Sequence, residues 1–518
     1  MTDLDLMLIT IPPVGVVAPL LGPAMVYSAA KNAGFNVIQY DWNLEFFEQH
    51  KTNEEVIEWI NFDSFNLNKS GEIFPLLENA ADQLVEKIAQ LNPRWVGLSV
   101  FTFRSKIVLE VLLPKIRKKC FGVKIALGGA GLTTSPPFEK MRASGLIDAF
   151  VNGEGEKTII NILNGELNQP GVNGVTPEPI KNLNELKLAD YSGLPLKQYG
   201  YVWYRKTKAT RNDRIGVFYV EGSRGCVRKC SFCDVPFTKP GFRFRSVENI
   251  INEIKILIEH NGAQHIYFVD SLVNGALKNL EMLTKELIIL KLANPNLTWV
   301  GYMIVRGRTA FPPENFERLA QSGAIQLKIG VESGSENVRK SMNKFIADAD
   351  IDYNIEQCFK NKIGVLVLLL VGYPTETRAD FEITLDLIRR NKDYIKGFAS
   401  ALSVSWKVGI DNHQSELAQN LKKYNLEFDI NNEWFSTHVN ILITSKRYIE
   451  LCNLADLLGV NNSNKYSHNR IYSKVAEYGV TKEDLNLGEE KLSEIYYRYI
   501  RSNPKQSLAP ALPEPSLF

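Results

Sequence analysis

The first third of the chain alternates short apolar runs with amphipathic stretches. Apolar runs of strand length lie at 6–11, 37–40, 95–100, 123–127 and 149–151, and helical patterns such as 22–33 and 107–118 lie between them. This alternation is typical of a doubly wound, Rossmann-like parallel sheet. We therefore expect an N-terminal α/β domain over residues 1–165, with its ligand beyond the carboxyl ends of the strands.

The same alternation returns in the middle of the chain. Strand patterns lie at 215–220, 265–269, 299–305, 325–331, 365–371 and 399–404, and helical patterns separate them. The run Val365–Val371 is the longest apolar segment and is bounded by glycines, which predicts a fully buried parallel strand. Six such units predict a partial (β/α)6 TIM-like barrel, with its main domain over residues 213–396.

The two remaining segments have other patterns. Residues 166–212 are interrupted by prolines, which predicts an extended linker laid over the junction of the two domains. Residues 397–518 are mostly helical in pattern and end in a proline-rich tail that we expect to be disordered. Four aromatic or histidine residues of this region, interpreted as packing or surface residues, are Trp406, Trp434, His438 and His468.

Composition and charge narrow the class of protein. The 518 residues suggest about three domains, and 45% hydrophobic residues allow well-filled cores. The 60 basic and 58 acidic residues give a net charge of +2, which provides no general reason to expect nucleic-acid binding. Six cysteines are too few for a disulfide framework, and the acidic start and lack of a long apolar run predict a cytoplasmic protein without a membrane segment.

Three cysteines stand close together after the apolar run 215–220. Cys226, Cys230 and Cys233 are too near one another to form a disulfide without distortion, whereas three thiolates from one loop suit a soft metal centre. In a [4Fe-4S] cluster the three thiolates would leave one iron without a protein ligand. An open coordination position on a metal usually indicates that a reaction takes place there. The alternatives are buried cysteines or a zinc site, for which His265 could supply a fourth ligand.

The Cys-x3-Cys-x2-Cys spacing, with Phe232 before the last cysteine and β/α units after it, resembles the radical S-adenosylmethionine superfamily over residues 215–396. This resemblance implies that the amino and carboxylate groups of S-adenosylmethionine chelate the open iron. Its reductive cleavage would give a 5′-deoxyadenosyl radical. The residues expected to contact S-adenosylmethionine are Phe232, Asp270, Arg306, Glu332, Ser333 and Gly372.

Each of these contacts has a competing interpretation. Phe232 would lie near the adenine or simply pack, and Asp270 would hold the ammonium group or cap the next helix. Arg306 would neutralise the carboxylate or form a solvated ion pair. Glu332 and Ser333 resemble the ribose-binding strand end of the family.

The N-terminal region resembles the cobalamin-binding domain of one radical S-adenosylmethionine class. The resemblance rests on Pro12-Pro13, the helix from Leu21-Gly22 to Gly34, Ser99 at a strand end, Leu-Gly-Gly at 127–129 and Gly-Glu-Gly-Glu at 153–156. It implies cobalamin contacts at Ser99, Gly128, Gly129 and Glu154. The Asp-x-His-x-x-Gly motif is absent and His50 is the only histidine between Leu4 and Ala149, so we expect no histidine on the lower face of cobalt.

The resemblance implies a cobalamin-dependent radical enzyme that methylates an unactivated carbon of a small molecule or peptide and takes electrons from a flavodoxin or ferredoxin. One alternative is a radical enzyme with a corrin-free N-terminal domain that oxidises or rearranges its substrate. Another is a non-catalytic iron-sulfur or zinc scaffold. A methylthiotransferase would need three further N-terminal cysteines, and only Cys120 lies there. No residue is assigned as catalytic.

Overall fold

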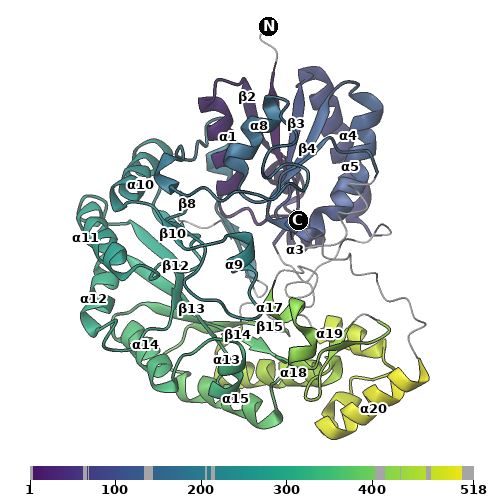
Figure 1. The fold of residues 1–518 in the computed structure, drawn as a ribbon, viewed down its shortest axis with the longest axis vertical. Helices are drawn as coiled ribbons and strands as arrows, with labels where there is room; N and C mark the ends of the chain where they lie inside the picture. Colours follow the sequence, from purple (N-terminus) through teal and green to yellow (C-terminus); the bar gives the residue numbers. More distant parts are fainter. Residues whose placement is uncertain are drawn as a thin grey trace.

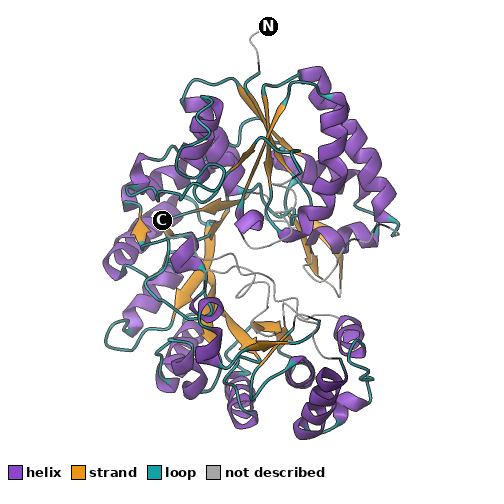
Figure 2. Cartoon of the chain, turned by 45° about the vertical axis from the view of Figure 1, so that its right-hand side comes forward, coloured by secondary structure: helices purple, strands orange, loops and turns teal. Residues whose placement is uncertain are grey.

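The computed structural model describes residues 4–61, 67, 69, 71–133, 144–204, 207–211, 216–402, 415–431, 433–462 and 468–503. Figure 1 shows two α/β units, one above the other, and Figure 2 shows the strands of both units covered by helices. Trp406 and the tail beyond residue 503 lie outside the described residues.

The upper unit is a five-stranded parallel sheet with the order β2-β1-β3-β4-β5. Its strands are β1 (Leu6–Thr10), β2 (Val37–Asp41), β3 (Trp95–Ser99), β4 (Lys124–Gly128) and β5 (Ala149–Phe150). The helices α1 (Leu21–Asn32) and α8 (Gly155–Leu163) cover one face, and α4 (Ile73–Leu91) and α5 (Lys106–Lys119) cover the other. The prediction of a doubly wound sheet is confirmed. The shorter helices are α2 (Trp42–His50), α3 (Glu54–Asn61), η1 (Phe103–Ser105) and α6 (Ala130–Thr133).

The lower unit is a curved, seven-stranded parallel sheet with the order β18-β15-β14-β13-β12-β11-β8. Its strands are β8 (Val217–Val220), β11 (His265–Phe268), β12 (Thr298–Ile304), β13 (Ala324–Glu332), β14 (Gly364–Val371), β15 (Gly397–Leu402) and β18 (Asn461–Asn462). The partial barrel is therefore confirmed, with one short edge strand that was not predicted. Two asparagines have no apolar pattern, so the sequence could not identify β18.

Alternate side chains of each barrel strand pack under the outer helices. Phe268, Trp299, Ile329 and Val367 belong to one buried core, which α1 enters through Ala24. The outer helices are α10 (Val247–Asn261), α11 (Leu277–Ala293), α12 (Pro313–Gln321), α13 (Glu336–Ser341), α14 (Asp348–Lys360) and α15 (Arg378–Asn391). Successive side chains of a strand point to opposite faces of the sheet. The side chains that do not pack under the outer helices therefore lie on the concave face.

The C-terminal region is mostly helical, as predicted. It contains α17 (Glu416–Gln419), η4 (Leu421–Tyr424), the pair β16 (Glu427–Phe428) and β17 (Trp434–Phe435), α18 (Ile441–Leu458), α19 (His468–Ala476), η5 (Asp484–Asn486) and α20 (Glu489–Ser502). Trp434 is buried, as expected for a packing residue.

The predicted linker is more folded than its prolines suggest. It contains η2 (Leu183–Glu185), η3 (Leu196–Gln198) and the hairpin of β6 (Tyr201–Tyr204) and β7 (Thr207–Arg211). Tyr199 is buried in the N-terminal core and Tyr191 in the barrel core, so the segment joins the two units by packing. No helix among the described residues is both long and apolar enough to cross a membrane.

Candidate functional site

The three predicted cluster cysteines lie on the loop that follows β8, at the carboxyl edge of the barrel sheet. The loop begins with β9 (Ser223–Arg224), which pairs with β10 (Arg243–Phe244), and ends at α9 (Val235–Thr238). Gly225 has φ of 85°, and an added Cβ would lie 2.0 Å from the carbonyl oxygen of Gly241. Only glycine allows this close approach, which holds the β9 end of the loop in place.

All three thiols are free and partly exposed. Burial raises the pKa of Cys233 to about 12 and also raises the pKa of Cys230, although Lys344 opposes the shift at Cys230. A bound metal would be needed to hold these groups as thiolates. Within the described residues, no three Cys, His, Asp or Glu side chains converge on a single metal ion. Thiolates that bind separate irons of a cubane do not have to converge in that way.

The back of the cysteine loop is fixed by the C-terminal half of the barrel. The backbone N–H of Ser231 donates to the Met342 carbonyl at 2.9 Å, and the hydroxyls of Ser231 and Tyr373 lie 2.8 Å apart. Leu417 N–H donates to the Ser231 carbonyl at 2.8 Å. Phe232 packs against the same buried cluster. Its predicted place near an adenine stays a prediction, because packing already accounts for its position.

Asp270 follows β11 and anchors the start of the cysteine loop. Its carboxylate accepts from Gly222 N–H at 2.9 Å and from the Ser223 hydroxyl at 2.5 Å, and the residue is buried. Burial raises its pKa to about 7, although both hydrogen bonds favour the carboxylate. The structure thus gives Asp270 a positioning role that the sequence did not indicate, and its predicted contact with an ammonium group stays a prediction.

The raised pKa of Asp270 predicts a pH effect on stability. The folded state retains this proton up to about pH 7, whereas the unfolded chain releases it near the usual aspartate pKa of 3.8. The stabilisation is therefore complete below pH 3.8 and is lost as the pH rises through about 7. Asp270→Asn should therefore reduce the fall in unfolding free energy between about pH 5 and 7.5 in urea titrations. Asp393→Asn, which changes an exposed carboxyl group, is the control. If the unfolding free energy of Asp270→Asn falls with pH as steeply as that of the wild type, the raised pKa of Asp270 is refuted.

Glu332 has an unusual conformation at the end of β13. Its φ is 71°, which is uncommon for a residue with a side chain, and the register between β13 and β14 shifts between Gly330 and Glu332. Its carboxylate pairs with Lys344 Nζ at 2.6 Å, and both residues are buried. Both charges also act on the thiol of Cys230. The strand end therefore brings a strained, charged side chain beside the cysteine loop, as at many functional sites.

Arg306 follows β12 on the same edge. Its Nη2 donates to the Asn274 carbonyl at 2.9 Å, while its buried Nε has no hydrogen-bond partner among the described residues. Burial lowers its pKa, the charge of Arg228 lowers it further, and Cys226 opposes this change. Arg306 therefore lies within electrostatic reach of the loop and retains a free donor.

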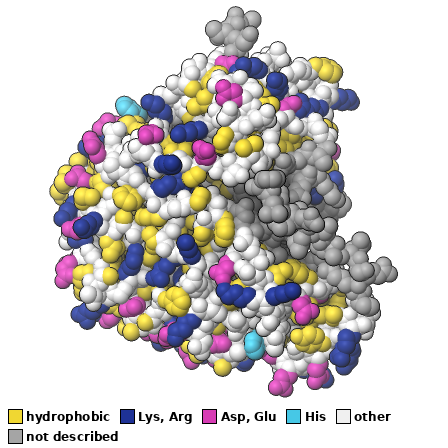
Figure 3. All heavy atoms as spheres, in the orientation of Figure 1, with side chains coloured by type: hydrophobic (Ala, Val, Ile, Leu, Met, Phe, Trp, Pro, Cys, Tyr) yellow, Lys and Arg dark blue, Asp and Glu magenta, His cyan; other side chains and the backbone are white. Residues whose placement is uncertain are grey.

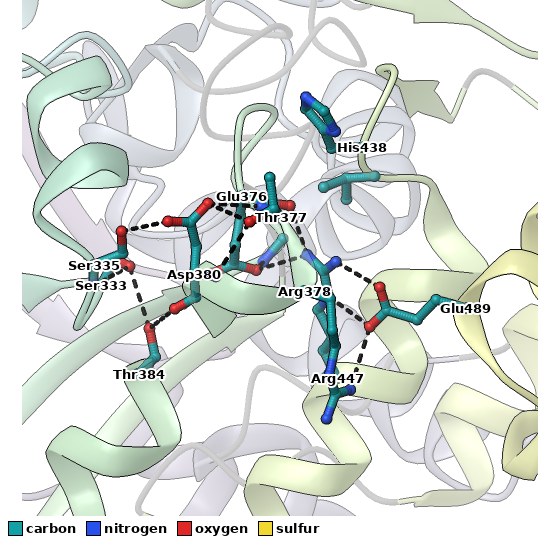
Figure 4. A network of polar contacts seen from close by, with 12 residues as sticks. Ser333, Ser335, Glu376, Thr377, Arg378, Asp380, Thr384, His438, Arg447 and Glu489 are labelled. Atoms are coloured by element: carbon teal, nitrogen blue, oxygen red, sulfur yellow. Dashed lines mark hydrogen bonds and ion pairs between the residues drawn. The ribbon is translucent and has the colours of Figure 1, made fainter. Parts of the chain in front are cut away.

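Ser333 and Gly372 occupy a different environment. Ser333 is fully buried, lies 3.2 Å from the Thr384 hydroxyl and accepts from Ser335 N–H at 3.2 Å. It belongs to the polar network drawn in Figure 4. An added Cβ on Gly372, which has φ of 80°, would lie 2.4 Å from Thr444 Oγ1. The structure accounts for both residues by packing and hydrogen bonding, and their predicted contacts stay predictions.

The four predicted cobalamin residues line one cavity. It has a volume of about 370 Å³ and lies at the carboxyl edge of the N-terminal sheet, with Ser99, Gly128, Gly129 and Glu154 in its wall. Gly129 has φ of 112°, and an added Cβ would lie 2.4 Å from the Val100 carbonyl oxygen. The backbone therefore approaches the cavity without a side chain in between, as a flat ligand requires.

The cysteine loop and the residues next to it also line this cavity, through Glu221, Arg224, Asp234, Thr238 and Lys239. Arg224, two residues before Cys226, is buried and pairs with Glu156 at 2.5 Å and Glu221 at 2.7 Å. Arg243 pairs with Glu154 at 2.8 Å. Burial opposes ionisation of Glu154, but Arg243 and Arg224 outweigh burial and lower its pKa.

These ion pairs join the two units at the cavity. The sequence did not single out Arg224, Glu156 or Lys344 as site residues. Glu156 stands inside the Gly-Glu-Gly-Glu stretch and Arg224 lies two residues before Cys226, which was the available signal. Lys344 had none, because only the folded chain brings it to Glu332.

Comparisons with known proteins agree with this arrangement. The sequence model of the Radical SAM superfamily matches residues 220–388. An uncharacterized methyltransferase of Pyrococcus horikoshii is 26% identical over 321 residues, which are 58% of this chain and 65% of that protein. A tRNA-2-methylthio-N(6)-dimethylallyladenosine synthase of Clostridium botulinum is 28% identical over 262 residues, which are 48% and 57% of the two chains. The chain thus spans less than two thirds of the length of these two relatives.

Two solved structures share the fold over most of the chain. The radical S-adenosylmethionine methyltransferase TsrM from Kitasatospora setae, with tryptophan and a S-adenosylmethionine analogue bound, has a TM-score of 0.62 at 14% identity and covers 92% of this chain and 100% of its own. The cobalamin-dependent enzyme OxsB with aqua-cobalamin bound has a TM-score of 0.57 at 14% identity and covers 97% and 84%. Residues 220–388 therefore belong to the radical SAM superfamily, and the chain has the fold of cobalamin-dependent radical SAM enzymes.

Proposed function

We propose that this protein is a cobalamin-dependent radical S-adenosylmethionine methyltransferase that acts on an unactivated carbon of a small molecule or peptide. The observation that carries the proposal is the shared cavity. Its lining includes Ser99, Gly128 and Gly129 of the N-terminal unit together with Arg224, which lies two residues before the first cluster cysteine. A ligand in this cavity lies beside the cysteine loop, as two cooperating cofactors require.

The lining residues fit the nucleotide tail of cobalamin. A cavity of about 370 Å³ suits a heterocycle with its sugar. Backbone at Gly128 and Gly129 allows close stacking, and no histidine occurs among the described lining residues.

The residues near the loop would divide the other tasks. Cys226, Cys230 and Cys233 would hold the cluster, Glu332 would accept from ribose hydroxyls, and the free Nε of Arg306 would face a carboxylate. When bound, the cluster, S-adenosylmethionine and cobalamin supply reductive bond cleavage and methyl transfer. The protein supplies orientation and exclusion of water.

The concave face of the barrel is the proposed substrate wall. Tyr219, Tyr267, Tyr302 and Lys328 lie on four neighbouring strands and are partly exposed. Lys328 Nζ lies 4.9 Å from the ring centroid of Tyr267 and 5.1 Å from that of Tyr302. A polar substrate that carries a ring could use both the cation and the aromatic faces.

The decisive experiment is anaerobic reconstitution with iron and sulfide, followed by reduction in the presence of S-adenosylmethionine. We expect formation of 5′-deoxyadenosine and a bound corrin spectrum after incubation with hydroxocobalamin. Cleavage without bound corrin would favour the radical enzyme with a corrin-free N-terminal domain. A metal-loaded protein that never cleaves S-adenosylmethionine would support the scaffold hypothesis.

Gly129→Val should remove cobalamin binding and leave the cluster intact. Its Cβ would meet the Val100 carbonyl oxygen at 2.4 Å, and φ of 112° adds backbone strain. Gly34→Val is the matched control, because Gly34 also has positive φ but an added Cβ there meets no atom within 4 Å. The measurement is bound corrin per protein after gel filtration, with iron content determined in parallel. Equal corrin binding by both variants would argue against this site.

A further inference from the structure

The concave face of the barrel sheet carries an ammonium group near its centre. Lys328 lies in the middle of β13, and β13 lies between β12 and β14. Its neighbours Leu327 and Ile329 are buried in the core under the outer helices, so the Lys328 side chain lies on the opposite, concave face. The residue is only partly exposed. The curve of the sheet therefore holds a cation that is partly withdrawn from bulk water.

Tyrosines fix the position of this ammonium group. Lys328 pairs in register with Tyr302 of β12, and its Nζ donates to the hydroxyl of Tyr267. The rings of both tyrosines lie beside the Nζ, and the Tyr267 ring packs in turn against that of Tyr219, with centroids 5.6 Å apart. Burial raises the pKa of Tyr267, and Tyr302 adds to the shift, so the hydroxyl stays uncharged. These contacts orient the cation but do not neutralise it.

The carboxylate that follows on this face of β13 belongs to another ion pair. Glu332 pairs with Lys344 at 2.6 Å, and Lys328 has no carboxylate partner among the described residues. An added Cβ on Gly330, two residues after Lys328, would lie 2.8 Å from Glu332 Oε1 and 2.9 Å from Lys344 Nζ, so the ion pair lies over Gly330. Two ammonium groups and one carboxylate leave a single positive charge. A partly buried charge without a partner is unfavourable, which indicates that a bound molecule supplies the anion.

Apolar side chains border this charged stripe on both sides. Gly330 pairs in register with Ile304 of β12 and with Leu368 of β14. The residues before and after each of them are buried in the barrel core, so Ile304 and Leu368 lie on the concave face. A ligand could therefore contact apolar and aromatic side chains with its body while its charged end meets Lys328.

We propose that Lys328 binds an acidic group, a carboxylate or a phosphate, of a ring-bearing substrate. This inference rests on the proposed function, because it names the class of substrate that the methyltransferase would accept. Lys328 and Glu332 are four residues apart, which places their Cα atoms about 13 Å apart along an extended strand. Glu332 lies beside the cysteine loop, where its charge acts on Cys230. The carbon that reacts is therefore separated from the acidic group by the body of the substrate.

Calorimetric titration of the anaerobically reconstituted protein with S-adenosylmethionine present tests this assignment. The probes are phenylacetate, phenyl phosphate and the neutral benzyl alcohol. We expect at least one acidic probe to bind roughly tenfold more tightly than benzyl alcohol, because a charge-assisted hydrogen bond is stronger than a neutral one. The tighter of the two acidic probes identifies the carboxylate or the phosphate as the preferred group. Equal binding of all three probes, or no binding of either acid, would overturn the proposal.

The ring is tested by acetate and inorganic phosphate, which carry the charge without the aromatic body. Each should bind more weakly than the ring-bearing probe with the same acidic group, since it lacks contacts with the tyrosines and with Leu368. Binding as tight as that of the ring-bearing probes would refute the ring-bearing substrate.

Lys328→Met removes the charge and keeps a side chain of similar length. The Kd for the preferred acidic probe should rise roughly tenfold, toward that of benzyl alcohol. The matched control is Lys360→Met on α14, where Lys360 pairs with Glu356 at 2.7 Å. Figure 3 shows acidic and basic side chains interspersed along the outer margin that α11, α12 and α14 form in Figure 1. The control should therefore keep the wild-type Kd.

An unchanged Kd in Lys328→Met, or an equal rise in Lys360→Met, would overturn the assignment to Lys328. The wild-type comparison of acidic and neutral probes decides the question even if Lys328→Met does not fold. Failure of the wild type to cleave S-adenosylmethionine under dithionite would instead refute the proposed function. The titration requires no turnover, so the two failures are distinguishable.

Discussion

Cys230→Ala is expected to abolish both the cluster and the formation of 5′-deoxyadenosine. Backbone hydrogen bonds hold Cys230 in place: Ser231 N–H donates to the Met342 carbonyl, and Cys233 N–H donates to the Cys230 carbonyl at 3.0 Å. Because the loop supplies only three thiolates, removal of one leaves two irons without protein ligands. The measurement is iron and sulfide content after anaerobic reconstitution, together with 5′-deoxyadenosine released under dithionite.

Cys358→Ala is the control for this experiment. Cys358 is also free and is fully buried in the barrel core, far in sequence from the loop. Its loss should lower stability by roughly 1 kcal/mol, as a small core truncation does, without changing the iron content. A complete cubane in Cys230→Ala would contradict the assignment of the three ligands.

Arg447→Met is expected to give the largest loss of stability among single substitutions away from the cofactors. Arg447 is 1% exposed and lies between Glu376, at 3.2 Å, and Glu489, at 2.7 Å (Figure 4). Removal of one partner from a buried ion pair leaves an uncompensated charge, which costs about 3–5 kcal/mol. The unfolding free energy from urea titration measures this cost.

The pH dependence of this variant has a defined sign. Burial already raises the pKa of Glu376 to about 7 against the opposing effect of Arg447. Without Arg447 the folded-state pKa rises further, so the variant should lose more stability above pH 7 than below it. Arg389→Met, which removes an exposed arginine from α15, should cost less than about 0.5 kcal/mol. Equal losses in the two variants would contradict this interpretation of the network.

Local sequence signals identified both sheets, because each strand is a short apolar run and the apolar residues of each helix recur with the helical period of 3.6 residues. The same reasoning missed β18, whose two asparagines pair with β15 only because α18 delivers them to that edge. It interpreted residues 166–212 as an extended linker laid over the domain junction, but it could not identify Tyr191 and Tyr199 as the residues that are buried in the two cores. Prolines report local chain stiffness and do not indicate where a segment packs.

The sequence by itself determined the order of the two α/β units, the three-thiol loop and the glycines that approach the N-terminal cavity, because these depend on local period, spacing and backbone freedom. Only the tertiary structure decided that Asp270 anchors the loop, that Lys344 pairs with Glu332, and that Arg224 faces Glu156 across the two units. These pairs join residues from separate elements. Their partners and burial, and therefore their charge states, exist only once the chain has packed.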